Sequence, residues 1–292
     1  MRRIALSFFL LVVSGIACAG TPPAGHIENF RFHSNIFDND RYVRVWLPPG
    51  YDDAANRGYR YPVLYMHDGQ FVYHATATKG MRGDWHADEV AAKLIAAGKI
   101  EPIVIVAIDN GGKGVRTREY LPVIDAYDES AKTVVGDRMP DVVFEEIVPF
   151  INSKFRTREG PDSVAIGGSS FGAVAALYCA TAKQGSVGKL LLESPSLYIH
   201  EGWLFKQLEE VKGWPQKIYV GIGTNEVPNN AEYSREAVDD VLRFEKMMKK
   251  AGFDKERMKV VIGEGTTHDE NAWAGRFPEA LKFLFGREKR KD

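Results

Sequence analysis

Ser170 lies in a motif that can make a serine hydroxyl nucleophilic. Residues 168–172, Gly-Ser-Ser-Phe-Gly, match the pattern GxSxG, with the apolar run 164–166 before them and the helix-prone run 173–177 after them. A strand, a tight turn and a helix around this pattern form a nucleophile elbow, in which glycines on both sides leave room for a strained turn. We therefore predict that Ser170 projects its hydroxyl group from the carboxyl end of a strand.

A serine nucleophile needs a base that accepts its proton and an acid that orients the base. His268 follows the apolar run 258–262, and Glu226 follows the run 218–222. Serine, acid and histidine thus follow three separate apolar runs, in the chain order of α/β hydrolases. We predict that Ser170, His268 and Glu226 form a catalytic triad. Three acids of the next helical segment are the alternatives to Glu226: Glu232, Asp239 and Asp240.

Acyl transfer also needs hydrogen-bond donors for the oxyanion of the tetrahedral intermediate, usually two backbone amides. One donor is expected at Phe171, because this residue follows the nucleophile at the amino end of a helix. The other is expected in the loop 67–71, where Gly69 allows a tight turn. Gln70 is the preferred donor, with Phe71 as the second choice. A loop with no catalytic role is the remaining alternative.

The pattern of apolar residues along the chain indicates an α/β domain. Seven runs rich in apolar and β-branched residues are typical of strands: 42–47, 62–66, 103–108, 164–166, 189–192, 218–222 and 258–262. Five segments have apolar residues at helical spacing: 88–97, 140–155, 171–183, 231–251 and 278–285. Continuous apolar strands that alternate with helices favour a mainly parallel central sheet with helices on both faces. Functional groups in such sheets gather outside the carboxyl ends of the strands.

The amino-terminal segment has the features of an export signal. Two arginines precede the apolar stretch 4–16, which is too short for a stable membrane span, and small residues permit cleavage after Ala19. We expect a signal peptide at 1–19, an exposed leader at 20–28, one catalytic domain at 29–286 and a charged tail at 287–292. The mature protein is then periplasmic or secreted. Lipid attachment at Cys18 is the alternative.

Charge, cysteine count and histidine spacing argue against nucleic-acid binding, an internal disulfide and a bound metal. A net charge of −1 with mixed acids and bases gives no electrostatic footprint for nucleic acid. Without the leader, Cys179 is the only cysteine, so no internal disulfide is possible, and we expect this thiol to be buried. Four other histidines do not group with carboxylates or cysteines at spacings that close around zinc, so we predict no metal: His67, His74, His86 and His200. His67 follows a strand run and is a candidate for lining the site.

Several motifs resemble those of the esterase family of the α/β hydrolases, which includes enterochelin esterases, feruloyl esterase domains, S-formylglutathione hydrolases and the mycolyltransferase antigens. The resemblance spans nearly all of the mature chain and is carried by the segments 65–70, 107–111, 118–120, 168–172, 223–226 and 268–273. The Asp-Gly-Gln loop at 68–70 is similar to that of the enterochelin esterase branch. Many relatives have aspartate where this chain has Glu226. The resemblance implies the α/β-hydrolase fold.

The resemblance also implies a serine esterase that needs no cofactor. Ser170 attacks the ester carbonyl, His268 transfers the proton, Glu226 orients His268, and water then cleaves the acyl enzyme. Two alternatives remain: an acyltransferase of the same fold, in which an alcohol replaces water, and a noncatalytic binding protein that keeps the fold.

The expected substrate is a small-molecule or glycan ester. A siderophore trilactone suits an exported enzyme of this type, with Lys113, Arg116 and Arg118 available for its acidic catecholates, and polysaccharide acyl esters suit the same compartment. A structural ion pair between Arg118 and Glu119 is an alternative to substrate binding by Arg118. Five residues at strand ends or among aromatic side chains are the candidates for substrate binding: Asp109, Asn110, Arg118, Tyr120 and Trp273.

Overall fold

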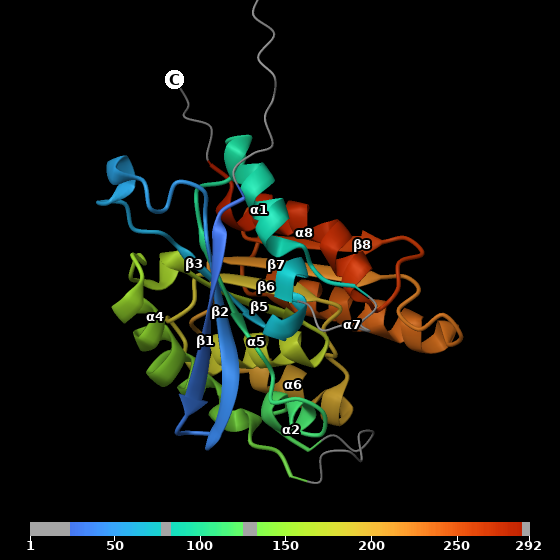
Figure 1. Cartoon of the computed structure of the whole chain (residues 1–292). Coiled ribbons are helices and arrows are strands. Elements are labelled where there is room, and N and C mark those ends of the chain that lie inside the picture. Colours follow the sequence, from blue (N-terminus) through green and yellow to red (C-terminus); the bar gives the residue numbers. More distant parts are fainter. Residues whose placement is uncertain (1–23, 77–82, 125–132, 288–292) are drawn as a thin grey trace, which may run out of the picture.

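The computed structural model describes residues 24–76, 83–124 and 133–287, which build one eight-stranded sheet (Figure 1). The strand order is β1-β2-β4-β3-β5-β6-β7-β8. β1 pairs with β2 and β2 with β4 in antiparallel register, and all other neighbours are parallel. The expected mainly parallel sheet is therefore confirmed.

The strands are β1 His26–Ser34, β2 Asn39–Leu47, β3 Val63–His67, β4 Val104–Ile108, β5 Val164–Ser169, β6 Lys189–Glu193, β7 Lys217–Gly223 and β8 Met258–Gly263. The α-helices are α1 Ala87–Ala96, α2 Arg116–Tyr120, α3 Met139–Asp141, α4 Val148–Lys154, α5 Phe171–Ala182, α6 Ile199–Glu209, α7 Ala231–Lys250 and α8 Glu270–Phe285. A π-helical stretch, η5 Val142–Ile147, joins α3 to α4. The short 3₁₀ helices are η1 Ala54–Asn56, η2 Gly69–Phe71, η3 His74–Thr76, η4 Gly136–Arg138 and η6 Pro161–Ser163.

Both faces of the sheet are covered, because alternate side chains of each strand enter different hydrophobic clusters. In β3, Val63 and Tyr65 belong to the cluster with α5 and α7, whereas Leu64 and Met66 belong to the cluster with α1 and α8. In Figure 1, α1 and α8 accordingly lie on the side of the sheet opposite to α5 and α6. Cys179 of α5 is buried, as expected, and burial raises the pKa of its thiol. Within the described residues, no helix combines the length and apolar character needed to cross a bilayer.

Four elements differ from the sequence-based expectation. Residues 26–28, expected in an exposed leader, begin β1, because Ile27 pairs with Trp46 across the antiparallel ladder and packs against the core. Helices α2 and α6 were not predicted, and α8 begins at Glu270 rather than near Pro278. The Asp269 side chain caps α8 by accepting a hydrogen bond from the Ala272 amide. The expected signal peptide at 1–19, Cys18 and the tail beyond residue 287 lie outside the described residues.

The parallel register brings the carboxyl ends of four strands to one edge of the sheet. Ser169 of β5 pairs with Glu193 of β6, and Glu193 pairs with Gly221 of β7. Gly223, the last residue of β7, pairs with Gly263, the last residue of β8. The segments that follow these strands carry Ser170, Glu226 and His268, so all three emerge at the same edge.

Asn230 fixes the start of α7 directly after the segment that carries Glu226. Its side chain accepts a hydrogen bond of 3.0 Å from the Tyr233 amide. Because this cap satisfies an otherwise unpaired helix amide, we expect Asn230→Ala to lower the free energy of unfolding by about 1 kcal/mol. Asn230→Asp keeps the acceptor and is the matched control. Urea unfolding followed by circular dichroism measures both, and an Asn230→Ala protein as stable as the control would contradict this role.

Candidate active site

Ser170 has the strained backbone of a nucleophile elbow. Its φ of 57° and ψ of −128° lie in a backbone region that residues other than glycine rarely adopt. Its amide donates a hydrogen bond of 3.0 Å to the Glu193 carbonyl, and α5 begins at the next residue. A Cβ atom at Gly168 would lie 2.7 Å from the backbone of Gly172, so the turn requires glycine there. Ser170 is half-buried, at the edge where a substrate can reach it.

Glu226 and His268 are joined by a short hydrogen bond. Glu226 Oε2 lies 2.5 Å from Nδ1 of His268, and the His268 amide donates to the Glu226 carbonyl at 3.2 Å. The Glu226 side chain is 1% exposed and the His268 side chain 31% exposed. The acid is thus shielded from water, while the imidazole reaches the surface of the site. The three alternative acids, Glu232, Asp239 and Asp240, belong to α7.

Two further groups hold the Glu226 carboxylate. Its Oε1 accepts hydrogen bonds from the Gly223 amide at 2.6 Å and from the Ser194 hydroxyl at 2.8 Å. Nε1 of Trp273 donates to the same hydroxyl at 2.9 Å, and the Trp273 ring meets the His268 ring edge to face at 5.3 Å. Trp273, a candidate for substrate binding, is 5% exposed and takes part in this buried network. Ser194 was not anticipated, and its positive φ of 41° has no signature in the sequence.

The expected oxyanion donors lie at a turn and at a helix end. The Phe71 amide donates to the Asp68 carbonyl at 3.0 Å inside η2, so it is already occupied. The Phe171 amide begins α5, where the helix dipole favours negative charge. Within the described part of the chain, neither the Gln70 amide nor the Phe171 amide has a hydrogen-bond acceptor. This difference favours Gln70 over Phe71.

Asp68 is the centre of a second buried network, under the elbow. Arg116 binds its carboxylate with two hydrogen bonds of 2.7 Å, and Asn110 donates to it at 2.6 Å. Burial raises the pKa of Asp68, but the charge of Arg116 and these hydrogen bonds outweigh burial and keep the pKa below its usual value. The hydroxyl of Tyr120 accepts a hydrogen bond from the Asp68 amide, and Tyr120 is 1% exposed. Asn110 and Tyr120, candidates for substrate binding, therefore support the 68–70 loop.

The remaining substrate candidates have different surroundings. The Asp109 carboxylate accepts hydrogen bonds from Nε and Nη2 of Arg44, at 2.8 and 2.6 Å. Burial raises the pKa of Asp109, although Arg44 opposes this shift. Arg118 is exposed on α2. Its neighbour Glu119 is buried and forms an ion pair of 2.9 Å with Arg41 of β2. Glu119 therefore pairs with Arg41 and not, as considered above, with Arg118.

His67 is buried rather than open to the site. It is 2% exposed, and neither ring nitrogen has a hydrogen-bond partner among the described residues. Burial lowers the pKa of His67 to about 4, so its imidazole is neutral near pH 7. Its Cβ lies 3.3 Å from the position that a Cβ on Gly172 would occupy, which places His67 directly below the elbow helix.

Glu193, the last residue of β6, is a buried carboxylate that sequence reasoning missed. It is fully buried, and Arg276 of α8 pairs with it at 2.7 Å. Burial raises the pKa of Glu193 to about 7; Arg276 opposes this shift and the Glu226 carboxylate adds to it. Its place directly after an apolar run was the only sequence signal, because Arg276 lies far away along the chain.

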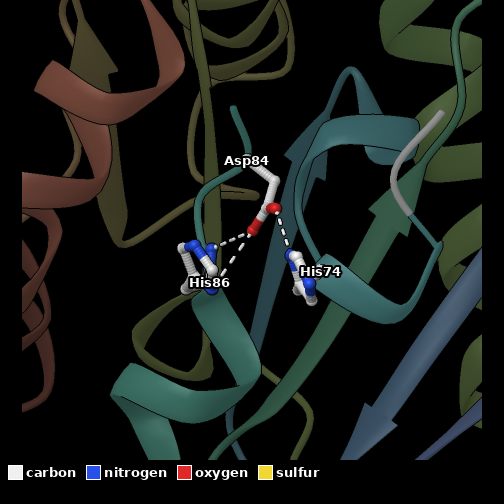
Figure 2. A group of neighbouring side chains, drawn as sticks. All are labelled: His74, Asp84 and His86. Atoms are coloured by element: carbon white, nitrogen blue, oxygen red, sulfur yellow. Dashed lines mark hydrogen bonds and ion pairs between the residues drawn. The ribbon is translucent and has the colours of Figure 1, made fainter. Parts of the chain in front are cut away.

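A third cluster of polar side chains contains two of the four histidines for which the sequence predicted no metal. His74 and His86 lie on either side of Asp84 (Figure 2), and one ligand atom of each residue lies within 4.8 Å of the others. Spacing along the chain did not reveal this group, because η3 lies beside the start of α1 only in the folded chain. His200, the fourth histidine considered, is at the start of α6.

A small cavity lies beside the proposed base. Among its lining residues are His268, Glu226, Leu197, Tyr198 and Tyr233. Its wall therefore combines the proposed catalytic groups with two aromatic rings, which meet edge to face at 5.7 Å. A larger cavity of about 360 Å³ lies at β1 and α4, and none of the proposed catalytic residues lines it.

Comparison with known proteins gives a family match and consistent structural neighbours. A family model described as "Putative esterase" matches residues 34–284. The "Endo-1,4-beta-xylanase/feruloyl esterase" of Xylanibacter ruminicola is 26% identical over 263 residues, which are 89% of this chain and 31% of that protein. The chain thus spans about a third of that relative.

Two solved structures share the fold. The enterobactin esterase from Shigella flexneri, crystallised in the presence of enterobactin, has a TM-score of 0.68 and 19% identity over 90% of this chain and 59% of its own. The ferulic acid esterase from Anaeromyces mucronatus has a TM-score of 0.63 and 20% identity over 88% of this chain and 90% of its own. The expected α/β-hydrolase fold is therefore confirmed.

The raised pKa of Glu193 predicts a pH dependence of stability. The native state keeps this proton up to about pH 7, whereas the unfolded chain loses it near 4.5, so the free energy of unfolding falls as pH rises between these values. From pH 5 to pH 8, we expect wild-type protein to lose on the order of 2 kcal/mol relative to Glu193→Gln, which cannot ionise. Urea unfolding of both proteins at the two pH values measures the difference. Equal losses in both would contradict the shift.

Proposed function

The chain belongs to the esterase family, and we propose that it is a carboxylic ester hydrolase that cleaves its substrate with Ser170 as nucleophile, His268 as base and Glu226 as orienting acid. The observation that carries the proposal is the contact of 2.5 Å between Glu226 and His268, at the sheet edge where Ser170 forms a strained turn. The order of the three residues along the chain supports the same roles.

The first half of the reaction acylates the enzyme. Ser170 Oγ attacks the carbonyl carbon while Nε2 of His268 takes the hydroxyl proton. The buried Glu226 carboxylate holds Nδ1–H and stabilises the positive charge that forms on the ring. The amides of Gln70 and Phe171 donate hydrogen bonds to the oxyanion. The tetrahedral intermediate then collapses, and His268 gives its proton to the leaving alcohol.

The second half releases the acid. A water molecule attacks the acyl carbon, and Nε2 of His268 takes one of its protons. When the second tetrahedral intermediate collapses, the same proton returns to Ser170 Oγ, and the carboxylic acid leaves. Each charged species is thus matched by a group that the fold already holds in place, so little reorganisation accompanies the chemistry.

We propose an ester with an aromatic acyl group as the substrate. Tyr198 and Tyr233 lie beside His268, and their rings offer an aromatic surface against which an aromatic acid can pack. A trilactone with acidic catecholates is the alternative: the charge of Arg116 is balanced by Asp68, whereas Lys113 and Arg118 are exposed. The expected export through the segment 1–19 suits polysaccharide acyl esters, and the relative from Xylanibacter ruminicola, which is named as an endo-1,4-beta-xylanase/feruloyl esterase, supports this choice.

Removal of the nucleophile tests the mechanism. We expect Ser170→Ala to lower kcat on a feruloyl ester by at least about 10³-fold and to abolish labelling by a fluorophosphonate probe. Ser169→Ala changes the neighbouring serine of the same motif and is the matched control. Hydrolysis and labelling are measured by product absorbance and intact mass. An active, labelled Ser170→Ala protein would eliminate the mechanism.

Neutralising the acid tests the role of Glu226. Glu226→Gln keeps the size of the side chain but cannot stabilise the imidazolium, so we expect kcat to fall by about 10²- to 10⁴-fold. Glu232→Gln, on the exposed face of α7, is the control and should retain wild-type activity. Steady-state kinetics on the same ester compare the two variants. A loss confined to Glu232→Gln would assign the acid to α7 instead.

A further inference from the structure

We propose that His74, Asp84 and His86 form a binding site for a divalent transition-metal ion, with Zn²⁺ as its representative. The site lies between η3 and the start of α1 and shares no residue with the proposed catalytic groups. Figure 2 shows the two imidazole rings on either side of the Asp84 carboxylate.

The distances suit ligands that converge on one ion. Nδ1 of His74 lies 2.8 Å from Asp84 Oδ2, and Nδ1 of His86 lies 3.5 Å from Asp84 Oδ1. The two rings are stacked with centroids 5.1 Å apart and an interplanar angle of 15°. Neighbouring ligands of a tetrahedral zinc ion are about 3.4 Å apart, given bond lengths near 2.1 Å. Small rotations of exposed His74 therefore complete the geometry.

The chemistry of the three ligands favours zinc over calcium or magnesium. Two imidazole nitrogens and one carboxylate oxygen form a borderline-soft set, whereas calcium and magnesium prefer oxygen ligands alone. Three protein ligands leave a position for water, which the exposure of His74 permits.

The fold holds two of the ligands in place. Asp84 is 5% exposed, and its Oδ1 accepts a hydrogen bond of 2.9 Å from the His86 amide. His86 has a φ of 47°, a left-handed conformation that is costly for histidine and aims its ring at the carboxylate. Nδ1 of His86 is buried and has no hydrogen bond among the described residues, although Asp84 and Glu89 oxygens lie 3.5 Å away. A bound ion would satisfy this nitrogen.

The position of the site gives the ion a structural role. Trp85, between two of the ligands, is 2% exposed and packs against Trp273 and Phe277 of α8. Trp273 in turn contacts the His268 ring. An ion that joins η3 to the start of α1 therefore braces the segment that supports α8 near the proposed base.

Zinc binding to the full chain without a polyhistidine tag tests the proposal, after treatment with a chelator. By isothermal titration calorimetry near pH 7.5, we expect one equivalent of Zn²⁺ to bind wild-type protein, and His74→Ala and His86→Asn each to weaken binding at least about 10-fold. His86→Asn removes the imidazole but keeps a residue that tolerates the left-handed conformation, so a failure to fold is not expected. His33→Ala, which removes an exposed histidine beside Asp40, is the matched control.

Thermal unfolding supplies a second measurement on the same proteins. Because an ion that binds only the native state stabilises it, Zn²⁺ should raise the Tm of wild-type and His33→Ala proteins by several degrees and leave the two ligand variants unchanged. Wild-type protein that binds no Zn²⁺, or ligand variants that bind it as tightly as the control, would overturn the proposal. The three side chains would then form only a hydrogen-bonded cluster at the start of α1.

Discussion

A buried negative charge at the end of β7 is the constraint on which the rest of the site depends. The carboxylate of Glu226 is removed from water, and a carboxylate in that position is stable only if each oxygen has donors. The Gly223 amide and the Ser194 hydroxyl serve one oxygen, and His268 serves the other. The donors therefore fix the direction of the carboxylate, and the carboxylate fixes the tautomer and orientation of the imidazole.

The sheet makes this arrangement possible because backbone hydrogen bonds, rather than side chains, set the distance between the two loops. The Thr224 amide donates to the Gly263 carbonyl, the Asn225 amide to the Thr266 carbonyl, and the His268 amide to the Glu226 carbonyl. These bonds continue the pairing of β7 with β8 beyond the last strand residues. Glu226 and His268 thus belong to segments that backbone hydrogen bonds hold side by side, so their side chains lie within hydrogen-bond distance.

Sequence reasoning predicted most of the strands because the signals were local. Apolar runs predicted seven of the eight strands, and the residues after those runs were the polar ones that meet at the sheet edge. The features that sequence reasoning missed are contacts between segments that meet only in the folded chain. Glu193 pairs with Arg276 across 83 positions, and the contact of His74 with Asp84 joins two elements whose nearness no local pattern reveals. The strand β1 was missed because its pattern is interrupted by polar residues, and its register comes from β2.

Glu193 explains how the site holds two carboxylates so close together. If both were charged and unpaired, their repulsion and loss of hydration would favour protonation of one of them, and the acid beside His268 has to remain charged to orient it. Arg276 pairs with Glu193 and also donates to the Thr266 hydroxyl, and burial raises the pKa of Glu193 to about 7. Burial thus favours a proton on the carboxylate that is not bonded to the imidazole. Glu226 is instead held by the Ser194 hydroxyl, the Gly223 amide and the His268 ring.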